Sequence, residues 1–269
     1  MPRIAKGELC FCIGLSEPNS GSDVFAASTR ARKAAGGYRV NGRKIWTSNA
    51  HEADYMIALL RTSPATGENR RYGLSQFLVD MRAPGISIRP IINLLGRHDF
   101  NEVVFDDVFL PDSYLVGDLD MASKQATDEL AFERSGPDRW IETFPALVEL
   151  VRSAGENPDE RLAEGIGRAV AQLMILRRMS ISVAGMLEAG KTPMVEAALV
   201  KDLGTNFEQS LPDKVRLLAP PPQEDDPDAN DNRFRAALRH ATLIAPKLTI
   251  QGGTREVLRG IIARGLGLR

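Results

Sequence analysis

Residues 16–23, Ser-Glu-Pro-Asn-Ser-Gly-Ser-Asp, form the first of two polar segments whose residue types suit ligand binding. They follow directly after the apolar run of residues 9–15, which reads as a short strand. A polar, glycine-containing loop at a strand end exposes backbone N–H groups and hydroxyls, which are the donors that an oxygen-rich ligand needs. The segment therefore predicts a loop that binds such a ligand.

The second polar segment covers residues 41–49 and contains Trp46. Its Asn41-Gly42 dipeptide suits the two positive-φ positions of a type I′ turn, so we expect a hairpin there. The return strand would then carry the indole of Trp46, a flat apolar ring, beside the hydroxyls of Thr47 and Ser48. A donor-rich loop together with an indole suits a planar cofactor that carries phosphate.

Composition excludes several classes of protein. The chain has 269 residues, and its 34 basic and 35 acidic side chains give a net charge of −1, which favours neither a nucleic-acid partner nor a membrane surface. No apolar run reaches the ~20 residues of a membrane span, and the first six residues do not resemble a secretory signal. Cys10 and Cys12 are too close for a disulfide and too few for a metal site. We expect buried thiols in a cytoplasmic protein without metal or membrane insertion.

The first part of the chain, up to about residue 117, has the pattern of a β domain. Short apolar runs bounded by Gly, Pro and Asp predict strands at residues 55–60, 75–79, 86–89 and 102–110. No long helical pattern separates these runs. An antiparallel sandwich or barrel is therefore favoured over a parallel sheet.

From about residue 118 the apolar spacing becomes helical. It predicts helices at residues 121–132, 162–187, 194–207, 234–244 and 255–264. An acidic, proline-rich linker at residues 220–228 would separate the third helix from the fourth. The chain is therefore predicted to be α+β, with a β domain over residues 1–117 followed by an antiparallel four-helix-type bundle over residues 118–269.

Four motifs in this order resemble those of the acyl-CoA dehydrogenase family. They are Ser-Glu-Pro through Gly-Ser-Asp at 16–23, Asn-Gly-Arg-Lys-Ile-Trp-Thr at 41–47, Glu-Val-Val-Phe-Asp-Asp-Val at 102–108, and a last segment from Gly-Thr-Arg-Glu-Val at 253–257 to Ile-Ala-Arg at 262–264. The resemblance covers nearly the whole chain. It implies a β domain and a C-terminal helical bundle that hold FAD and an acyl-CoA thioester.

The resemblance also assigns residues to the cofactor and the substrate. On the flavin it places Ile13, Leu15, Ser16, Gly21 and Ser22, and on its other side Trp46, Thr47 and Ser48. Ser22 is also expected to reach the CoA portion of the substrate. Thr254 and Glu256 fall where the family contacts the cofactor, at a helix N-terminus suited to a pyrophosphate.

The reaction implied by the resemblance is an α,β-dehydrogenation, with hydride transfer to flavin N5 and a carboxylate that removes the α-proton. Many members carry that glutamate just before the terminal Gly-Thr, where this chain has Gly252. A subset carries it on the first helix of the C-terminal domain, at the position of Glu133. We therefore expect Glu133 to be the base, the Gly252 N–H to hold the thioester oxygen, and Arg134 to line the substrate pocket.

Two departures from the family keep alternatives open. The family's N-terminal helical domain of over a hundred residues has no counterpart here, and the usual Arg-x-x-Phe-Gly segment is replaced by Ser-Gly-Pro-Asp-Arg-Trp at 135–140. The chain could therefore be a fragment or a non-catalytic, partner-dependent subunit of a heteromeric enzyme. A same-fold flavin monooxygenase is a third possibility. The family also implies a homo- or hetero-oligomer and an electron-transfer flavoprotein or a similar acceptor as partner.

Overall fold

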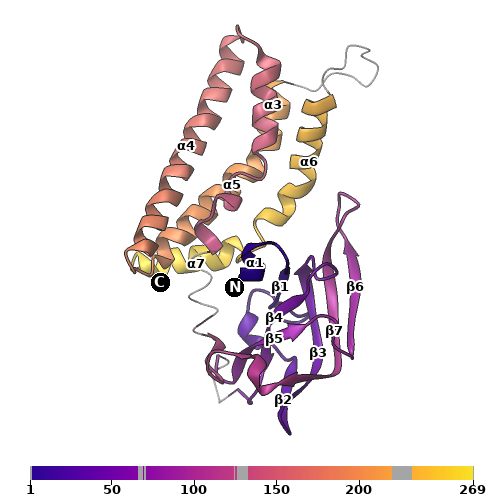
Figure 1. Ribbon diagram of the computed structural model, residues 1–269. Helices are drawn as coiled ribbons and strands as arrows, with labels where there is room; N and C mark the ends of the chain where they lie inside the picture. The colour runs from indigo at the N-terminus through magenta and orange to yellow at the C-terminus, as the bar shows by residue number, and fades with distance from the viewer. Residues whose placement is uncertain are drawn as a thin grey trace. The chain divides into compact units, whose positions relative to one another are not determined.

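The computed structural model describes residues 2–65, 69, 71–123, 125, 133–219 and 232–268, with only the backbone of residue 232. It separates the chain into two compact units, Met1–Thr127 and Asp128–Arg269 (Figure 1). The domain boundary that the sequence placed after residue 117 stays a prediction. Each unit is described by itself.

The first unit is built around one mostly antiparallel sheet. Its strands are β1 Phe11–Gly14, β2 Arg30–Ala34, β3 Gly37–Ser48, β4 Tyr55–Arg61, β5 Leu74–Asp80, β6 Ile86–Ile92, β7 His98–Pro111 and β8 Leu115–Val116. The strand order is β6-β7-β3-β2-β4-β5-β8, and β1 pairs in parallel with β4. The short elements are α1 Pro2–Ala5, η1 Val24–Ala26 and η2 Asp112–Tyr114. This sheet confirms the predicted β region and its four strand segments.

Alternating apolar residues build the core of this unit. Met56 on β4, Phe77 on β5, and Val103 and Val108 on β7 are fully buried in one hydrophobic cluster. A strand sends successive side chains to opposite faces, so such alternation buries one face of the sheet. The core fixes the register of β3, the strand that carries Trp46.

The predicted hairpin at Asn41-Gly42 is wrong. β3 runs unbroken through both residues, and Asn41 pairs with Arg30 of β2. The turn between β2 and β3 instead lies at Gly36, whose φ of 73° is easily adopted only without a side chain. Gly42, with a φ of 144°, lies at a bulge where β3 shifts register against β7. Pairing on both sides of β3 thus outweighs the local turn preference.

The second unit is a helical bundle. Its helices are α3 Phe144–Ala154, α4 Glu160–Glu188, α5 Met194–Leu218, α6 Asn232–Leu248 and α7 Arg255–Gly265, and the short η3 Pro137–Arg139 precedes them. Figure 1 shows α3, α4, α5 and α6 lying alongside one another, with α7 across one end. α5 packs against α4, α6 and α7, which makes it the central helix of the unit. The expected α+β class with a C-terminal helical bundle is confirmed.

The sequence did not predict α3. Pro145 lies in the first turn of α3, where a missing N–H costs nothing, so it does not interrupt the helix. Of the helix predicted at 121–132, only residues 121–123 and 125 are described, and the predicted linker at 220–228 lies outside the described residues. Cys12 is buried as expected, whereas Cys10 is exposed because it precedes β1.

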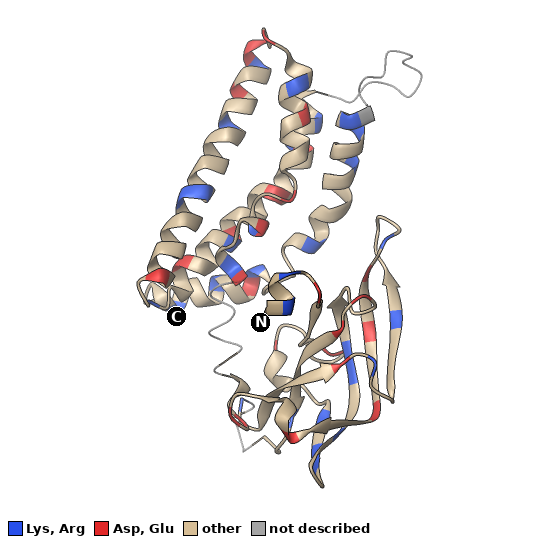
Figure 2. Ribbon diagram, in the orientation of Figure 1, with Lys and Arg blue, Asp and Glu red and all other residues tan. Residues whose placement is uncertain are grey.

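By length and composition alone, α4 is apolar enough to cross a membrane. Ala169, Leu176 and Val183 of α4 lie in the bundle core, and 17% of its most apolar window is buried inside the structure. Arg177 and Arg178 also stand at its middle, where a bilayer would penalise charge. Figure 2 shows acidic and basic residues mixed along both units, in line with the balanced composition.

Candidate functional site

A buried ion pair ties the loop at residues 16–23 to β3. The ammonium of Lys44 donates to Glu17 at 2.8 Å and to the Leu15 carbonyl at 3.2 Å, and its side chain is 0% exposed. The Ile45 N–H also donates to the Ser16 carbonyl at 2.9 Å. The two motifs that the sequence analysis singled out are therefore joined in the structure.

The oxygens of Glu17 are well satisfied. They accept hydrogen bonds from the N–H and hydroxyl of Ser28, from the Thr29 N–H and from Lys44, at 2.7 to 2.9 Å. Burial alone would raise the pKa of Glu17, but the charge of Lys44 and these donors outweigh it and lower the pKa to about 2. Glu17 is thus an ionised structural anchor beneath the loop.

β1 passes close to Lys44 because residue 14 is glycine. A Cβ on Gly14 would lie 3.2 Å from Cγ of Lys44 and 2.5 Å from Sδ of Met56. No side chain fits in that space. The close approach lets β1 place Ile13, which is exposed, next to the start of the polar loop.

Trp46 projects from a bulge in β3. Between Lys44 and Thr47 the register against β7 shifts by one residue, and Trp46 has a φ of 60°, a conformation that large side chains rarely adopt. Its side chain is 57% exposed and contacts Phe100 edge to face, with ring centroids 6.1 Å apart. An exposed indole held by a strained backbone is a ready wall for a flat ring.

Thr47 supports the fit of a polar, flat cofactor at β3. It is buried, and its hydroxyl oxygen has no hydrogen-bond partner within the described residues. Its carbonyl is held by the buried amide of Asn101 at 3.1 Å. A buried polar atom without a partner costs free energy unless a ligand or water supplies one. The polar edge of a flavin would be such a partner.

The remaining cofactor candidates of this unit lie on its surface. Glu17 and Ser20 exchange backbone hydrogen bonds at 2.8 and 3.0 Å, which turns the loop back on itself. Gly21 and Ser22 follow that turn and are exposed, as is Ser48, while Leu15 and Ser16 are half-buried. Leu15 and Ser16 are thus hydrogen-bonded to β3, whereas Gly21 and Ser22 lie in the exposed part of the loop.

In the second unit, Glu133 is held by an arginine that the sequence analysis did not consider. Arg139 of η3 donates to Oε1 of Glu133 at 2.6 Å and to its carbonyl at 3.1 Å. The side chain of Arg139 is 5% exposed, whereas that of Glu133 is 42% exposed. The carboxylate therefore has one oxygen anchored by a buried cation and a face open to solvent.

Gly252 lies against this carboxylate. A Cβ on Gly252 would stand 3.3 Å from Oε1 of Glu133, 3.4 Å from Cζ of Arg139 and 3.1 Å from Cε of Lys201. Gly252 also has a φ of 70°, so its backbone conformation favours glycine independently of that space. The Arg134 guanidinium donates to the Gly252 carbonyl at 2.9 Å. The structure therefore brings the adjacent residues Glu133 and Arg134 together with Gly252, which lies 118 residues beyond Arg134 in the sequence.

Lys201 of α5 completes this cluster and was also missed. Its side chain is fully buried, and its ammonium donates to the Leu248 carbonyl at 3.5 Å. Burial, reinforced by the charges of Arg139 and Arg134, lowers the pKa of Lys201 to about 8, although Glu133 and Asp202 act in the opposite direction. The sequence carries no signal for it, because its burial appears only in the structure, where α5 also buries Ala197, Ala198, Val200, Gly204 and Thr205.

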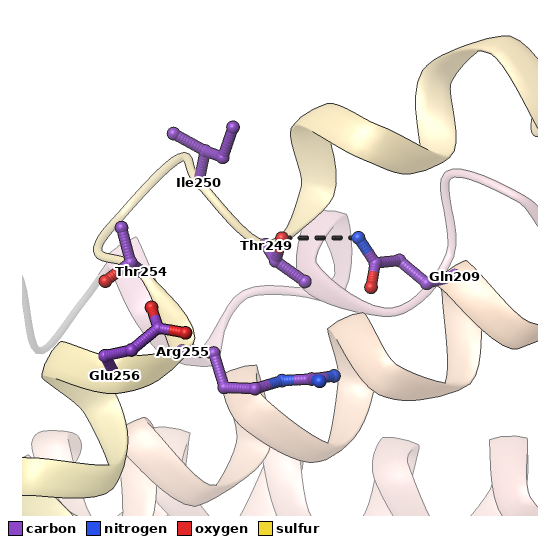
Figure 3. Close-up of a pocket in the computed structure, with 6 residues that line it drawn as sticks. All are labelled: Gln209, Thr249, Ile250, Thr254, Arg255 and Glu256. Carbon is purple, nitrogen blue, oxygen red and sulfur yellow. Dashed lines mark hydrogen bonds between the residues drawn. The ribbon is translucent and has the colours of Figure 1, made fainter.

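Thr254 and Glu256 lie at the start of α7, beside a cavity of about 160 Å³. The Thr254 hydroxyl caps the helix by accepting from the Val257 N–H at 3.4 Å. Hydrogen bonds from the backbone N–H of Glu256 and from Thr254 lower the pKa of Glu256. Figure 3 shows both residues around the cavity with Gln209, Thr249, Ile250 and Arg255. Ligand pockets usually measure roughly 300–1,000 Å³. This cavity could therefore take only one part of a dinucleotide.

No group of three or more metal-binding side chains occurs in the described parts of the chain. His51 and His98 stack with ring centroids 3.8 Å apart. Their shared partner is Asn101, at 3.2 Å from His51 and 2.6 Å from His98. This pair braces β7 against the end of β3.

Comparisons with known proteins agree with the geometry. A model of the acyl-CoA dehydrogenase middle domain matches residues 12–108. Acyl-CoA dehydrogenase FadE34 of Mycobacterium tuberculosis is 32% identical over 270 residues, which cover all of this chain and 36% of FadE34. Acyl-CoA dehydrogenase IpdE1 of the same organism is 32% identical over 274 residues, which cover all of this chain and 69% of IpdE1. The chain thus spans about a third of FadE34.

Solved structures resemble the whole chain as well. The Tcur3481-Tcur3483 steroid ACAD G363A variant has a TM-score of 0.87 at 26% identity, over all of this chain and 71% of that one. The ChsE4-ChsE5 complex from Mycobacterium tuberculosis has a TM-score of 0.84 at 28% identity, over all of this chain and 71% of that one. With the fold, the motif positions and the relatives in agreement, the chain belongs to the acyl-CoA dehydrogenase family.

Proposed function

We propose that this chain catalyses the FAD-dependent α,β-dehydrogenation of an acyl-CoA thioester, with Glu133 as the base. The observation that carries the proposal is the contact between Glu133 and Gly252, because the carboxylate fills the space where a side chain at residue 252 would stand. Glu133, which comes from a different segment of the chain, can thus replace the glutamate side chain that residue 252 lacks. FAD is the cofactor of the family.

The residues of the first unit suit the cofactor. When bound, FAD supplies the acceptor for the β-hydrogen of the substrate as hydride. Trp46 offers a flat apolar wall, and the Thr47 hydroxyl lacks a partner that a polar ring edge would provide. Ile13, Leu15, Ser16, Gly21, Ser22 and Ser48 are proposed to complete the flavin surface. Thr254 and Glu256 are proposed to contact another part of the cofactor.

The residues of the second unit suit the proton transfer. Glu133 takes the α-proton through its exposed face while Arg139 holds its other side. The Gly252 N–H donates no hydrogen bond within the described residues, so it is free to hold the thioester oxygen, on which negative charge develops. Arg134 donates to the carbonyl of the same glycine and so helps to hold the turn at residues 252–253.

The test begins with the purified chain, loaded with FAD, desalted and mixed with acyl-CoA without oxygen. A straight-chain acyl-CoA and one bearing a steroid are compared, because one similar structure is a steroid ACAD. We expect the flavin absorbance to bleach with wild type and with Glu164→Gln, a control glutamate paired with Arg168 on α4. Glu133→Gln should retain FAD but bleach at least ~10²-fold more slowly. Equal bleaching by Glu133→Gln would disprove its role as base.

A second candidate function is that of a subunit that works only with a partner. Two of the similar structures, Tcur3481-Tcur3483 and ChsE4-ChsE5, are complexes of two named proteins, which favours such an arrangement. This function predicts that bleaching appears only when a co-purified second subunit is present. Bleaching by the chain alone, at the same rate with and without a partner, would exclude it.

A further inference from the structure

The Gly252 turn is surrounded by more positive than negative charge. Three side chains, those of Glu133, Arg139 and Lys201, converge within 3.4 Å of the point that a Cβ on Gly252 would occupy. The guanidinium of Arg134 lies on the neighbouring glycine, 3.3 Å from the point that a Cβ on Gly253 would occupy. Three cations therefore face the carboxylate of Glu133, and one of them, Arg139, also pairs with Asp138 at 3.2 Å.

The other acidic group beside Lys201 is already engaged. Asp202 follows Lys201 on α5, and its oxygens lie 3.5 Å from Nε of Arg255 and 3.4 Å from Nε of Arg259, both on α7. The charges that face Lys201 are thus Arg134, Arg139, Glu133 and Asp202. Because Asp202 is shared with two arginines of α7, Glu133 is the carboxylate left to balance Lys201.

We propose that Lys201 is a positioning residue for the reaction, one whose buried ammonium acts through Glu133 and the Gly252 turn rather than through the substrate. This inference rests on the proposed function. The positive charge of Lys201 attracts the Glu133 carboxylate toward the Gly252 turn and so opposes the attraction of Arg139. The Cε of Lys201 lies 3.1 Å from the point that a Cβ on Gly252 would occupy, so its charge adds to the field that stabilises negative charge on the thioester oxygen.

The charge of Lys201 is lost within an accessible pH range. Because its pKa is about 8, the ammonium is mostly protonated at pH 7 and mostly neutral at pH 9. The cluster around Gly252 then changes from three cations to two. The proposal therefore predicts that the titration of Lys201 near pH 8 changes both the environment of Glu133 and the rate of proton transfer.

The deciding measurement is the pH dependence of the Glu133 carboxyl ¹³C resonance in the full, FAD-loaded chain, assigned by its loss in Glu133→Gln. We expect an inflection near pH 8 in wild type and in Lys214→Met, a control on the exposed face of α5. The inflection should be absent in Lys201→Met. This readout needs no acyl-CoA, so it tests Lys201 independently of the dehydrogenase assay.

Turnover supplies the second readout. With acyl-CoA, kcat should fall about tenfold from pH 7 to pH 9 in wild type, and Lys201→Met should be slow at both pH values with KM little changed. Lys201→Arg, which keeps its charge, should restore the rate at pH 9. A Glu133 resonance without an inflection near pH 8, or one that persists in Lys201→Met, overturns the inference. An inactive wild type with the inflection present would instead count against the proposed function.

Discussion

The two units bury charge in opposite ways. In the sheet unit, Glu17 and Lys44 form a pair of one acid and one base in which the acid accepts four hydrogen bonds and both side chains are hidden. In the helical unit, Arg134, Arg139 and Lys201 lie around the partly exposed carboxylate of Glu133, and the exposed Asp138 is a second acid at Arg139. A pair with balanced charge and satisfied hydrogen bonds stabilises the fold. A cluster with an excess of positive charge is instead suited to bind negative charge on a ligand.

The largest effect is expected from breaking the balanced pair. Lys44→Met leaves Glu17 buried without its counter-charge and should lower the free energy of unfolding of the sheet unit by about 3–5 kcal/mol. Arg82→Met, which breaks the exposed pair with Asp54, should change the same quantity by less than about 1 kcal/mol. Urea unfolding followed by fluorescence measures both. Equal losses from the two variants would contradict the structural role given to Lys44.

The pair should also show in the pH dependence of stability. The pKa of Glu17 is about 2 when folded, below its ordinary value of 4.5, so its contribution is complete above pH 4.5 and is lost as the pH falls toward 2. The shift corresponds to about 3 kcal/mol at most. A wild type that loses no more stability than Glu17→Gln between pH 5 and pH 3 would show that the pair contributes little.

Lys201 should produce the same trend, a stability that rises with pH, but in the alkaline range. Its folded pKa of about 8 lies below the ordinary 10.5, so its contribution is present above pH 10.5 and is lost as the pH falls through 8. Wild type should therefore gain up to about 3 kcal/mol of unfolding free energy relative to Lys201→Met between pH 7.5 and pH 10. Parallel stability curves for the two proteins would show that this buried lysine does not titrate in the folded state.

Glu208 tests whether the helical unit tolerates an uncompensated buried acid. Burial raises its pKa to about 7, and one of its oxygens has no partner within the described residues. Its contribution is complete below pH 4.5 and is lost as the pH rises through 7. Glu208→Gln should therefore be more stable than wild type by about 1–3 kcal/mol at pH 8 and equal to it at pH 4. A destabilised Glu208→Gln at pH 8 would mean that the charged form is needed.

The parts predictable from sequence were those encoded locally. Apolar alternation gave the strands, helical spacing gave α4, α5, α6 and α7, and the motifs at 16–23 and 41–49 lie together through Lys44. The Asn41-Gly42 turn failed because pairing with β2 and β7 outweighs a dipeptide preference. The helix α3 was not predicted, and its Pro145 is tolerated because it lies in the first turn.

The charge cluster could not be read from the sequence because its members meet only through the fold. Residues 135–140 were noted as a departure from the family, yet the short η3 turn in them folds Arg139 back onto Glu133. Lys201 looks like any helix lysine until it is found among the buried residues Val200, Gly204 and Thr205 of α5. The absence of a side chain at Gly252 was the one clue in the sequence, because it implies that side chains from elsewhere in the chain occupy that space.

The smallest change, the addition of one methyl group, distinguishes an effect on stability from an effect on the reaction in the helical unit. Gly252→Ala and Gly155→Ala both place a Cβ on a positive-φ residue, at 70° and 65°, and each should cost about 1–2 kcal/mol of stability. Only at Gly252 does the methyl group meet Glu133 and Lys201; at Gly155 it points into open space. Gly252→Ala should therefore slow acyl-CoA dehydrogenation about tenfold or more while Gly155→Ala leaves it unchanged, as measured by flavin bleaching. If both variants lose stability equally and neither loses rate, the space beside Gly252 serves the fold and not Glu133.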